Sequence, residues 1–313
     1  MEQRIGLIGL GSVGHLYVGH LLGANGRLVV FDADVDRVAR AVAQGASAAN
    51  SAAELAATCD VLLLSLPSPE AVEQVMLGGG GVLEGAHPGA LVIDASTIDP
   101  RTNRRMYHAA REQGVRYLDA PISGGEPGGA GTDGARQASI TFMVGGDREA
   151  YEQALAVFGL VGKHWFYLGP SGAGSTVKLL SNLMAGLHNL VATEALVLGA
   201  AAGFGPELLL EVFEHTDARS FTLTDYLAPR IRRRDFEPGF SVDLMYKDHR
   251  LAADLGRDLR VPLLLNEVAL QVYQMLRAQG LGSKDHVETL NFWGKLAGAD
   301  PFSPRPARGA EAD

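Results

Sequence analysis

The stretch GLIGLGSVGHLYVGHLL, residues 6–22, decides how the first half of the chain is interpreted. The apolar run 4–8 reads as a strand, a Gly-x-Gly-x-x-Gly pattern follows at Gly9, Gly11 and Gly14, and a helical pattern continues from there. In this context the first glycine permits a tight turn, the second lets the backbone approach a pyrophosphate, and the third lets helix and strand pack closely. The stretch therefore predicts a dinucleotide site, with phosphates at the positive end of the helix.

The next apolar run, 28–32, ends in Asp32, which lies 18 residues after Gly14. An acid at this spacing binds the adenosine ribose hydroxyls and repels a 2′-phosphate. Neither Ala33 nor Asp34 offers a cation for that phosphate, so NAD is predicted in preference to NADP. The alternative is a generic glycine-rich turn followed by a surface aspartate. The predicted cofactor contacts of this region are Gly9, Leu10, Gly11, Ser12, Val13, Gly14 and Asp32.

Short apolar runs alternate with helical patterns as far as residue 168, which predicts βαβ units and a parallel sheet. The expected strands are 4–8, 28–32, 61–66, 91–94, 117–119, 140–144 and 165–168. The expected helices between them are 13–22, 35–44, 69–76 and 100–113. After the turn Gly169-Pro170-Ser171-Gly172 the patterns are helical, over 174–203, 206–214, 220–234, 243–256, 262–279 and 285–297.

This change of pattern predicts the domain organisation. We expect an α/β domain over residues 1–168, with a Rossmann-type, doubly wound, mostly parallel sheet. An all-α domain over residues 169–299 is expected to serve the substrate and oligomerisation. The polar, proline-rich segment 300–313 is expected to be a loose tail.

Composition narrows the class of protein. The 313 residues are 47% hydrophobic and carry a net charge of −9, which disfavours a nucleic-acid partner. The lone Cys59 precedes an apolar run and reads as a core residue, and no cluster has metal-ligand spacing. The first residues lack a signal-peptide pattern, and His188, Asn189 and Glu194 interrupt the longest apolar stretch, so no membrane span is expected. We expect a cytoplasmic protein without a metal.

Several polar groups follow the predicted strands. Ser96 and Thr97 follow the strand 91–94, where they either face a ligand crevice or start the next helix, for which Asp99-Pro100 is an alternative start. Leu66-Pro67 could likewise be a simple turn. Ser123-Gly124-Gly125 can present a hydroxyl and backbone N–H groups to a carboxylate, or can be a flexible turn.

The segment GAGSTVKLLSNLMAGLHNL, residues 172–190, predicts an apolar helix that carries Lys178 and Asn182. At 100° per residue these two side chains lie 40° apart on one helix face, with Gly174 and Asn189 nearby in angle. A lysine is usually solvated, but the apolar neighbours of Lys178 weaken that interpretation. In a partly dry cleft such a lysine can exchange a proton with a substrate oxygen. Lys247-Asp248, by spacing alone, reads as a surface ion pair.

Seven motifs occur in one order along the chain: GLGSVG, Leu66-Pro67, DASTIDP, DAPISGG, FMVGG, GSTVKLLSN and MYKD. Over about residues 4–298 this ordered set resembles the β-hydroxyacid dehydrogenase family, which includes 3-hydroxyisobutyrate dehydrogenase, tartronate semialdehyde reductase and glyoxylate/succinic semialdehyde reductases. The resemblance implies Lys178 as the catalytic lysine and Asn182 as the residue that orients the substrate. It implies substrate contacts from Ser123, Gly124, Gly125, Phe240 and Asp248. It implies further cofactor contacts from Leu66, Pro67, Thr97 and Lys247.

The sequence departs from the family pattern at two places. Val13 stands where methionine is common. Between SGG and MVGG the chain has seventeen residues where the family commonly has about eleven. This added segment carries Arg136 and could either reshape the substrate pocket or loop into solvent, which leaves the substrate open.

The resemblance implies hydride transfer between NAD(H) or NADP(H) and a small β-hydroxyacid or the matching semialdehyde acid, with Lys178 as general acid and base. The implied partners are this small anionic substrate and copies of the chain, in a homodimer or homotetramer. Two alternatives stay open. One is an imine reductase of the same architecture, which usually has Asp or Tyr where Lys178 stands. The other is a dinucleotide-binding regulatory protein without catalysis.

Overall fold

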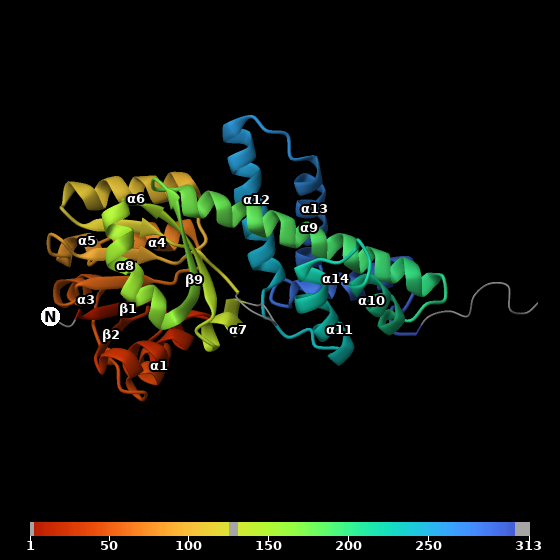
Figure 1. Cartoon of the computed structure of the whole chain (residues 1–313), viewed down its shortest axis with the longest axis horizontal. Helices are drawn as coiled ribbons and strands as arrows, with labels where there is room; N and C mark the ends of the chain where they lie inside the picture. The colour runs from red at the N-terminus through yellow and green to blue at the C-terminus, as the bar shows by residue number, and fades with distance from the viewer. Residues whose placement is uncertain (1–2, 125–130, 304–313) are drawn as a thin grey trace, which may run out of the picture. The chain divides into compact units, whose positions relative to one another are not determined.

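The computed structural model describes residues 3–124 and 131–303 (Figure 1). The chain divides after Leu179 into two compact units. The first is an α/β unit and the second is helical, which confirms the fold class expected from the sequence. The domain limits expected at residues 168 and 299 stay a prediction.

The first unit is built on a sheet with the order β3-β2-β1-β4-β5-β6-β8-β7, with β9 paired to β8. The six strands β3, β2, β1, β4, β5 and β6 run parallel in this spatial order, and the strand order reverses direction between β1 and β4. Open α/β sheets in general bind ligands at such a switch point. Antiparallel β8 continues the sheet beyond β6. The strands are β1 (Ile5–Ile8), β2 (Leu28–Phe31), β3 (Ser47–Ala48), β4 (Val61–Leu64), β5 (Leu91–Asp94), β6 (Arg116–Asp119), β7 (Ile122–Ser123), β8 (Ile140–Gly146) and β9 (Gly162–Gly169).

Helices cover both faces of this sheet because its central strands are apolar on both sides, as parallel strands generally are. One face packs against α1 (Gly14–Asn25), α2 (Val35–Val42) and α8 (Arg148–Val161). The other face packs against α3 (Ala52–Thr58), α4 (Pro69–Leu77), α5 (Val82–Gly85) and α6 (Pro100–Glu112). Cys59 is fully buried in this second layer, as its apolar context predicted, and burial raises the pKa of its thiol.

Side-chain caps fix the starts of four of these helices. Asp34, Ser51, Ser68 and Asp99 each accept a backbone N–H bond from the first turn of α2, α3, α4 and α6. Such a cap stabilises a helix by about 1 kcal/mol. At α6 this settles an alternative left by the sequence: Asp99, with Pro100 as the first helical residue, is the helix start, so Ser96 and Thr97 lie before it.

The described part of the added segment is ordered into helix α7 (Gly131–Arg136). Ala135 of α7 is fully buried in the core beside α1, and the ring Nε2 of His20 on α1 contacts the carbonyl oxygens of Ala135 and Arg136, at 3.1 Å each. This part of the segment therefore packs on the core of the first unit, while the Arg136 side chain is exposed. Residues 125–130, which include Gly125, lie outside the described part of the chain.

The second unit consists of helices around a core that includes Leu190, Met245, Tyr273 and Phe292. In its described residues the element order holds no strand, and Ser241 and Asp285 form one isolated bridge. The elements are the later part of α9 (Ala173–Ala201), then α10 (Pro206–Glu214), η1 (Thr222–Leu227), α11 (Ala228–Arg233), α12 (Val242–Leu259), α13 (Leu264–Ala278), η2 (His286–Glu288) and α14 (Thr289–Ala297).

Two expected helices differ in detail. The segment 220–234 is a π-helical turn, η1, followed by α11, rather than one α-helix. The segment 285–297 begins with the 3₁₀ turn η2, because Asp285 caps Val287 at the start of that turn. A π-helical turn often marks a functional region, because it displaces side chains from the regular helical positions.

Helix α9 is one unbroken helix of 29 residues, drawn in green in Figure 1. By length and composition alone it could cross a membrane, and 39% of its most apolar window is buried inside the protein. Its buried polar side chains include Lys178, Asn182, Asn189 and Thr193. Asn189 donates to the Tyr273 hydroxyl at 3.2 Å and to the His286 carbonyl at 3.1 Å, so it holds the helical unit together.

Candidate active site

Each glycine of the glycine-rich loop between β1 and α1 is needed for a different reason. Gly9 has a φ of 92°, and a side chain there would meet the Ser65 carbonyl oxygen at 2.3 Å. A Cβ at Gly14 would lie 1.9 Å from the Gly9 carbonyl oxygen, so α1 can approach the loop only without a side chain. At Gly11 the nearest atom to a Cβ is Arg37 Nη1, at 3.7 Å, which leaves its backbone open to a ligand.

Helix α1 begins directly after the glycine-rich loop, and the N–H groups of His15 and Leu16 donate to the carbonyl oxygens of Gly11 and Val13. Its N-cap residue, Val13, provides no side-chain cap, unlike the N-cap residues of α2, α3, α4 and α6. The first N–H groups of a helix need partners, and the helix dipole favours an anion there. A phosphate group at the loop Leu10–Val13 would meet both needs. The loop therefore fits a dinucleotide as the sequence predicted.

Asp32 follows β2 and connects this loop to the first turn of α2. Its carboxylate accepts the N–H of Leu10 at 2.6 Å and that of Asp34 at 2.8 Å, and its side chain is 10% exposed. Arg37, which the sequence reasoning missed, lies 3.7 Å from Asp32 and 3.1 Å from Asp34. A signal existed, because an arginine three residues after an N-cap aspartate lies on the same turn. One cation is thus shared by two carboxylates.

A hollow of about 250 Å³ lies between this loop and α2, lined by Gly11, Ser12 and His15 on one side and by Arg37 and Arg40 on the other. Its basic side chains and the open Gly11 backbone suit a phosphorylated or polar ligand. The hollow therefore belongs to the predicted cofactor site.

The ends of β4 and β5 are joined by side-chain contacts. Ser96 accepts the N–H of Leu66 at 2.9 Å through its hydroxyl, and it donates its own N–H to Asp94 at 2.9 Å. Leu66-Pro67 and Ser96-Thr97 therefore follow neighbouring parallel strands at the same edge of the sheet as the glycine-rich loop. In an open α/β sheet this edge binds the ligand.

Ser123 ends β7, paired with Thr141 of β8, and Gly124 follows it. Both residues are partly exposed, and the third member of the motif, Gly125, lies outside the described residues. The aspartate that opens this motif, Asp119, is fully buried at the end of β6. Burial raises its pKa, although backbone N–H groups of Gly172, Ser175 and Gly174 oppose that shift.

Lys178 lies on α9 in the same unit as the glycine-rich loop, and only 6% of its surface is exposed. The interpretation as an ordinary solvated lysine is therefore wrong for this residue. Of its apolar neighbours on α9, Leu179 is fully buried, whereas Val177 and Leu180 are exposed.

In the helical unit, Asn182 and Asp248 come together. The amide of Asn182 donates to Asp248 Oδ2 at 2.5 Å, and Lys247 Nζ lies 3.3 Å from Asp248 Oδ1. Asp248 is 2% exposed, so the interpretation of Lys247-Asp248 as a surface pair is wrong. Three residues that the family resemblance singled out thus form one polar group on α9 and α12.

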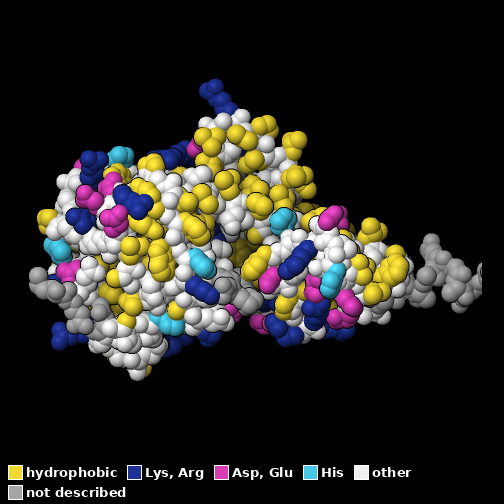
Figure 2. Space-filling model, viewed as in Figure 1, with side chains coloured by type: hydrophobic (Ala, Val, Ile, Leu, Met, Phe, Trp, Pro, Cys, Tyr) yellow, Lys and Arg dark blue, Asp and Glu magenta, His cyan; other side chains and the backbone are white. Residues whose placement is uncertain are grey.

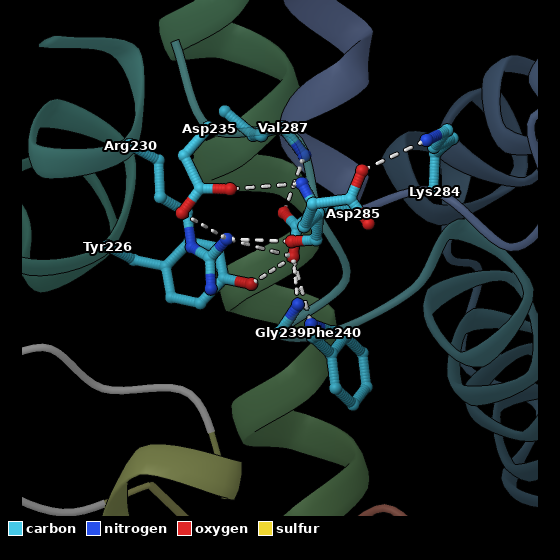
Figure 3. A network of polar contacts seen from close by, with 9 residues as sticks. Tyr226, Arg230, Asp235, Gly239, Phe240, Lys284, Asp285 and Val287 are labelled. Atoms are coloured by element: carbon cyan, nitrogen blue, oxygen red, sulfur yellow. Dashed lines mark hydrogen bonds and ion pairs between the residues drawn. The ribbon is translucent and has the colours of Figure 1, made fainter. Parts of the chain in front are cut away.

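Phe240, in the turn before α12, is held through its backbone (Figure 3). Asp285 Oδ2 accepts the N–H groups of Gly239 at 2.8 Å and Phe240 at 2.9 Å, together with the Tyr226 hydroxyl at 2.6 Å. Arg230 lies 3.7 Å from the same oxygen. These contacts fix the turn that leads into α12, the helix that carries Lys247 and Asp248.

The charge on Asp285 is stabilised by its neighbours. Burial opposes the charge, but His286, the Tyr226 hydroxyl and Arg230 outweigh it and hold the pKa of Asp285 below its usual range. The pKa of His286 is lowered by burial, and its ring stacks on Tyr226 at 4.8 Å. Sequence reasoning missed Asp285 because an Asp in a loop gives no signal of burial.

Among the described residues, no group of three or more His, Cys, Asp or Glu side chains is arranged to hold a metal ion. The side chains of the predicted site that can carry proton chemistry include the buried lysine and the hydroxyl and carboxylate groups described above. Acid–base chemistry beside a dinucleotide is the reaction class that such groups suit.

Comparisons with known proteins agree with this geometry. Residues 4–169 match the family described as the NAD-binding domain of 6-phosphogluconate dehydrogenase. Residues 172–293 match the family described as NAD-binding of NADP-dependent 3-hydroxyisobutyrate dehydrogenase. The chain is 36% identical to 2-(hydroxymethyl)glutarate dehydrogenase of Eubacterium barkeri over 94% of this chain and 96% of that protein. It is also 36% identical to an NAD-dependent L-serine dehydrogenase of Pseudomonas aeruginosa over 90% and 95%.

Solved structures give the same result. The 3-hydroxyisobutyrate dehydrogenase of Mycobacterium tuberculosis, solved with L-serine, superposes with a TM-score of 0.84 at 29% identity over 93% of this chain and 99% of that one. An imine reductase from a Pseudomonas species shares the fold at 18% identity, with a TM-score of 0.54 over 93% and 99%. The chain belongs to the β-hydroxyacid dehydrogenase family, whose named relatives are nicotinamide-dependent dehydrogenases.

Proposed function

We propose that this protein oxidises a small β-hydroxyacid, or reduces the matching semialdehyde acid, with Lys178 as general acid and base. The observation that carries the proposal is a nearly buried lysine in the unit that holds the glycine-rich loop. The uncapped start of α1, the open Gly11 backbone and Asp32 fit a dinucleotide. When bound, the nicotinamide supplies the hydride acceptor or donor.

The chain's own residues would supply the remaining functions. Neutral Lys178 would accept the hydroxyl proton during oxidation, and protonated Lys178 would return a proton to the alkoxide oxygen during reduction. Such help contributes on the order of 10²–10⁴-fold to a rate. Asn182, Phe240 and Asp248 are proposed to contact the substrate, as are Ser123, Gly124 and Gly125. Thr97, Leu66, Pro67 and Lys247 are proposed to contact the cofactor.

The test is Lys178→Ala, compared with Lys163→Ala, which changes an exposed lysine of the same unit. Turnover would be followed by the absorbance of reduced nicotinamide with a panel of hydroxyacids and one cyclic imine. We expect Lys178→Ala to lose on the order of 10²-fold or more of turnover and to keep its NADH affinity. Near-normal turnover would exclude the assignment. Reduction of the imine alone would favour the imine reductase, and no turnover by the unmodified protein would favour a regulatory role.

We propose NAD in preference to NADP because Asp32 holds a negative charge beside the predicted ribose site, and Arg37 is already paired with Asp32 and Asp34. Asp32→Asn keeps an acceptor for the Leu10 N–H but removes the charge. We expect Asp32→Asn to lower the ratio of the NADPH dissociation constant to the NADH dissociation constant about tenfold, equivalent to about 1.4 kcal/mol of binding free energy. Arg37→Ala is the companion variant. If it weakens NADPH and not NADH, Arg37 binds a 2′-phosphate and the NAD preference is wrong.

We further propose that the protein is cytoplasmic and forms a homodimer or homotetramer. Large apolar side chains are exposed at the end of the α12–α13 hairpin, at Leu259, Val261, Leu264, Leu265 and Val268. Figure 2 shows yellow side chains over the upper end of this hairpin. Single exposed apolar residues are ordinary, whereas contiguous ones mark contact surfaces. Leu265→Arg should lower the mass measured by light scattering, and an unchanged mass would exclude this surface.

A further inference from the structure

Asp119 opens the DAPISGG motif, yet the proposed chemistry gives it no part. Its side chain is fully buried at the carboxyl end of β6. A buried carboxylate is costly unless donors surround it. The identity of those donors therefore indicates what the residue does.

The donors belong to the start of α9. Asp119 Oδ1 accepts the N–H of Gly172 at 2.7 Å, and Oδ2 accepts the N–H of Ser175 at 3.0 Å. The Ser175 hydroxyl lies 3.4 Å from Oδ2. A helix is usually capped by a neighbouring residue in the chain. Here a carboxylate more than fifty residues earlier caps it, so the cap fixes α9 to the sheet.

Two glycines allow this close approach. A Cβ at Gly145 of β8 would lie 2.7 Å from Asp119 Oδ1 and 2.9 Å from the Ala173 nitrogen. A Cβ at Gly174 of α9 would lie 2.2 Å from the Met143 carbonyl oxygen and 2.7 Å from that of Asp119. The glycines of FMVGG and GSTVK therefore serve the same contact. One carboxylate and two missing side chains set the position of the first turn of α9.

Lys178 follows Ser175 by three residues on this helix. Ser175 is 1% exposed and is also bound through its hydroxyl by the Asn103 amide. Because an α-helix repeats every 3.6 residues, a fixed Ser175 sets both the height and the direction of Lys178. We propose that Asp119 is a positioning residue for the catalytic lysine, acting through the first turn of α9. This inference rests on the proposed role of Lys178.

The test is a double-mutant cycle on the full chain, with Asp119→Asn, Lys178→Ala and both together. We expect Asp119→Asn alone to lower kcat about 10- to 100-fold, the scale of a small misplacement of a reacting group. Its NADH dissociation constant should stay within about threefold of the unmodified protein, because the glycine-rich loop is untouched. In the Lys178→Ala background, methylamine is added to the assay to take over the proton transfer of the missing amine and so to rescue turnover. Asp119→Asn should change this rescued rate less than about twofold.

The outcomes separate the two proposals. If Asp119→Asn lowers the methylamine-rescued rate by the same factor as in the unmodified protein, Asp119 does not act through Lys178 and the inference is wrong. A normal kcat for Asp119→Asn also overturns it. Full turnover of Lys178→Ala without methylamine overturns the proposed function as well. Val157→Ala, a core substitution on α8, controls for lost stability and should keep kcat at the assay temperature.

A milder variant keeps the test decisive if Asp119→Asn does not fold. Ser175→Ala removes the hydroxyl contacts and keeps the N–H bond to Asp119. We expect a fall in kcat of about 2- to 10-fold, the equivalent of one hydrogen bond. This fall should also disappear in the methylamine-rescued Lys178→Ala background. An equal fall in both backgrounds would contradict positioning.

Discussion

Asp94 in the nucleotide-binding unit and Asp285 in the helical unit are both fully buried, and the two carboxylates are surrounded differently. Asp94, in the nucleotide-binding unit, receives the Ser96 N–H at 2.9 Å and contacts the Tyr117 hydroxyl at 2.8 Å. Asp285, in the helical unit, receives two backbone N–H groups, a hydroxyl and the field of Arg230. Burial raises the pKa of Asp94 to about 6, whereas the pKa of Asp285 lies below its usual range.

The difference teaches that burial alone does not decide whether a carboxylate is charged. The charged neighbour that acts on Asp94 is another carboxylate, Asp119, whereas for Asp285 it is Arg230. The Tyr117 hydroxyl also has a single hydrogen between two oxygens, that of Asp94 and Asn103 Oδ1 at 2.6 Å. A protonated Asp94 can donate to Tyr117, which then donates to Asn103. The same substitution, Asp→Asn, should therefore have opposite effects at the two sites.

The largest effect is expected for Asp285→Asn. This substitution removes the charge that pairs with Arg230 and places an amide group beside the backbone N–H donors. Breaking a buried ion pair costs about 3–5 kcal/mol of unfolding free energy. The chain has two tryptophans, Trp165 in the first unit and Trp293 in the second. Urea unfolding followed by Trp293 in a Trp165→Phe background reports on the helical unit. A loss below about 1 kcal/mol would contradict the ionic description of this site.

The second prediction concerns Asp94→Asn, which can donate to Tyr117 as a protonated Asp94 does. The pKa of Asp94 is about 6 in the folded protein and about 3.9 in the unfolded chain, so protonation of Asp94 stabilises the folded protein. This stabilisation is complete below about pH 4 and is lost as the pH rises through about 6. Its loss amounts to at most about 3 kcal/mol. The difference in unfolding free energy between Asp94→Asn and the unmodified protein should therefore shift in favour of the variant as the pH rises from about 4.5 to about 8. Unfolding followed by Trp165 fluorescence in a Trp293→Phe background measures this difference in unfolding free energy. A difference that does not change with pH would refute the prediction.

The third prediction tests the cation beside Asp285. Arg230→Met keeps an unbranched side chain and removes the charged guanidinium group that lies over the Tyr226 ring. We expect a loss of about 1–3 kcal/mol, because a charged partner is lost from a buried group. The lowered pKa of Asp285 gives stability that is present above its unfolded pKa and lost as pH falls through the folded one. Acid unfolding of Arg230→Met should therefore begin at higher pH. If acid unfolding of Arg230→Met began at an unchanged pH, the backbone N–H donors would be enough to keep the pKa of Asp285 low.

The smallest effect is expected at a partly exposed carboxylate. Asp60 is 35% exposed, and the N–H of Arg4 donates to it at 2.8 Å. Asp60→Asn should cost less than about 1 kcal/mol, because water replaces most of what the charge loses. Thermal unfolding of this variant beside Asp94→Asn sets the scale for the comparison. A cost equal to that at Asp285 would mean that burial is not what separates these sites.

Patterns of residues predicted the parallel sheet, the glycine-rich loop and the long helix with Lys178, because period and spacing carry those features. The short elements were missed, among them β3, β7, α3 and α5, because two to seven residues show little periodicity. α8 was missed although it has fourteen residues. Contacts between residues far apart in the sequence were also missed: Asp119 with Gly172, and Asp285 with Phe240. Each depends on side chains that meet only after folding, which one sequence does not reveal.

The burial of Cys59 has a practical consequence for labelling. It is the single cysteine of the chain, it is fully buried, and its raised pKa keeps the reactive thiolate scarce. A thiol-directed fluorophore or spin label would then react at a cysteine introduced on the surface, for example by Arg136→Cys in the first unit or Arg233→Cys in the second. A pair of such labels would turn any ligand-driven motion between the two units into a measured distance.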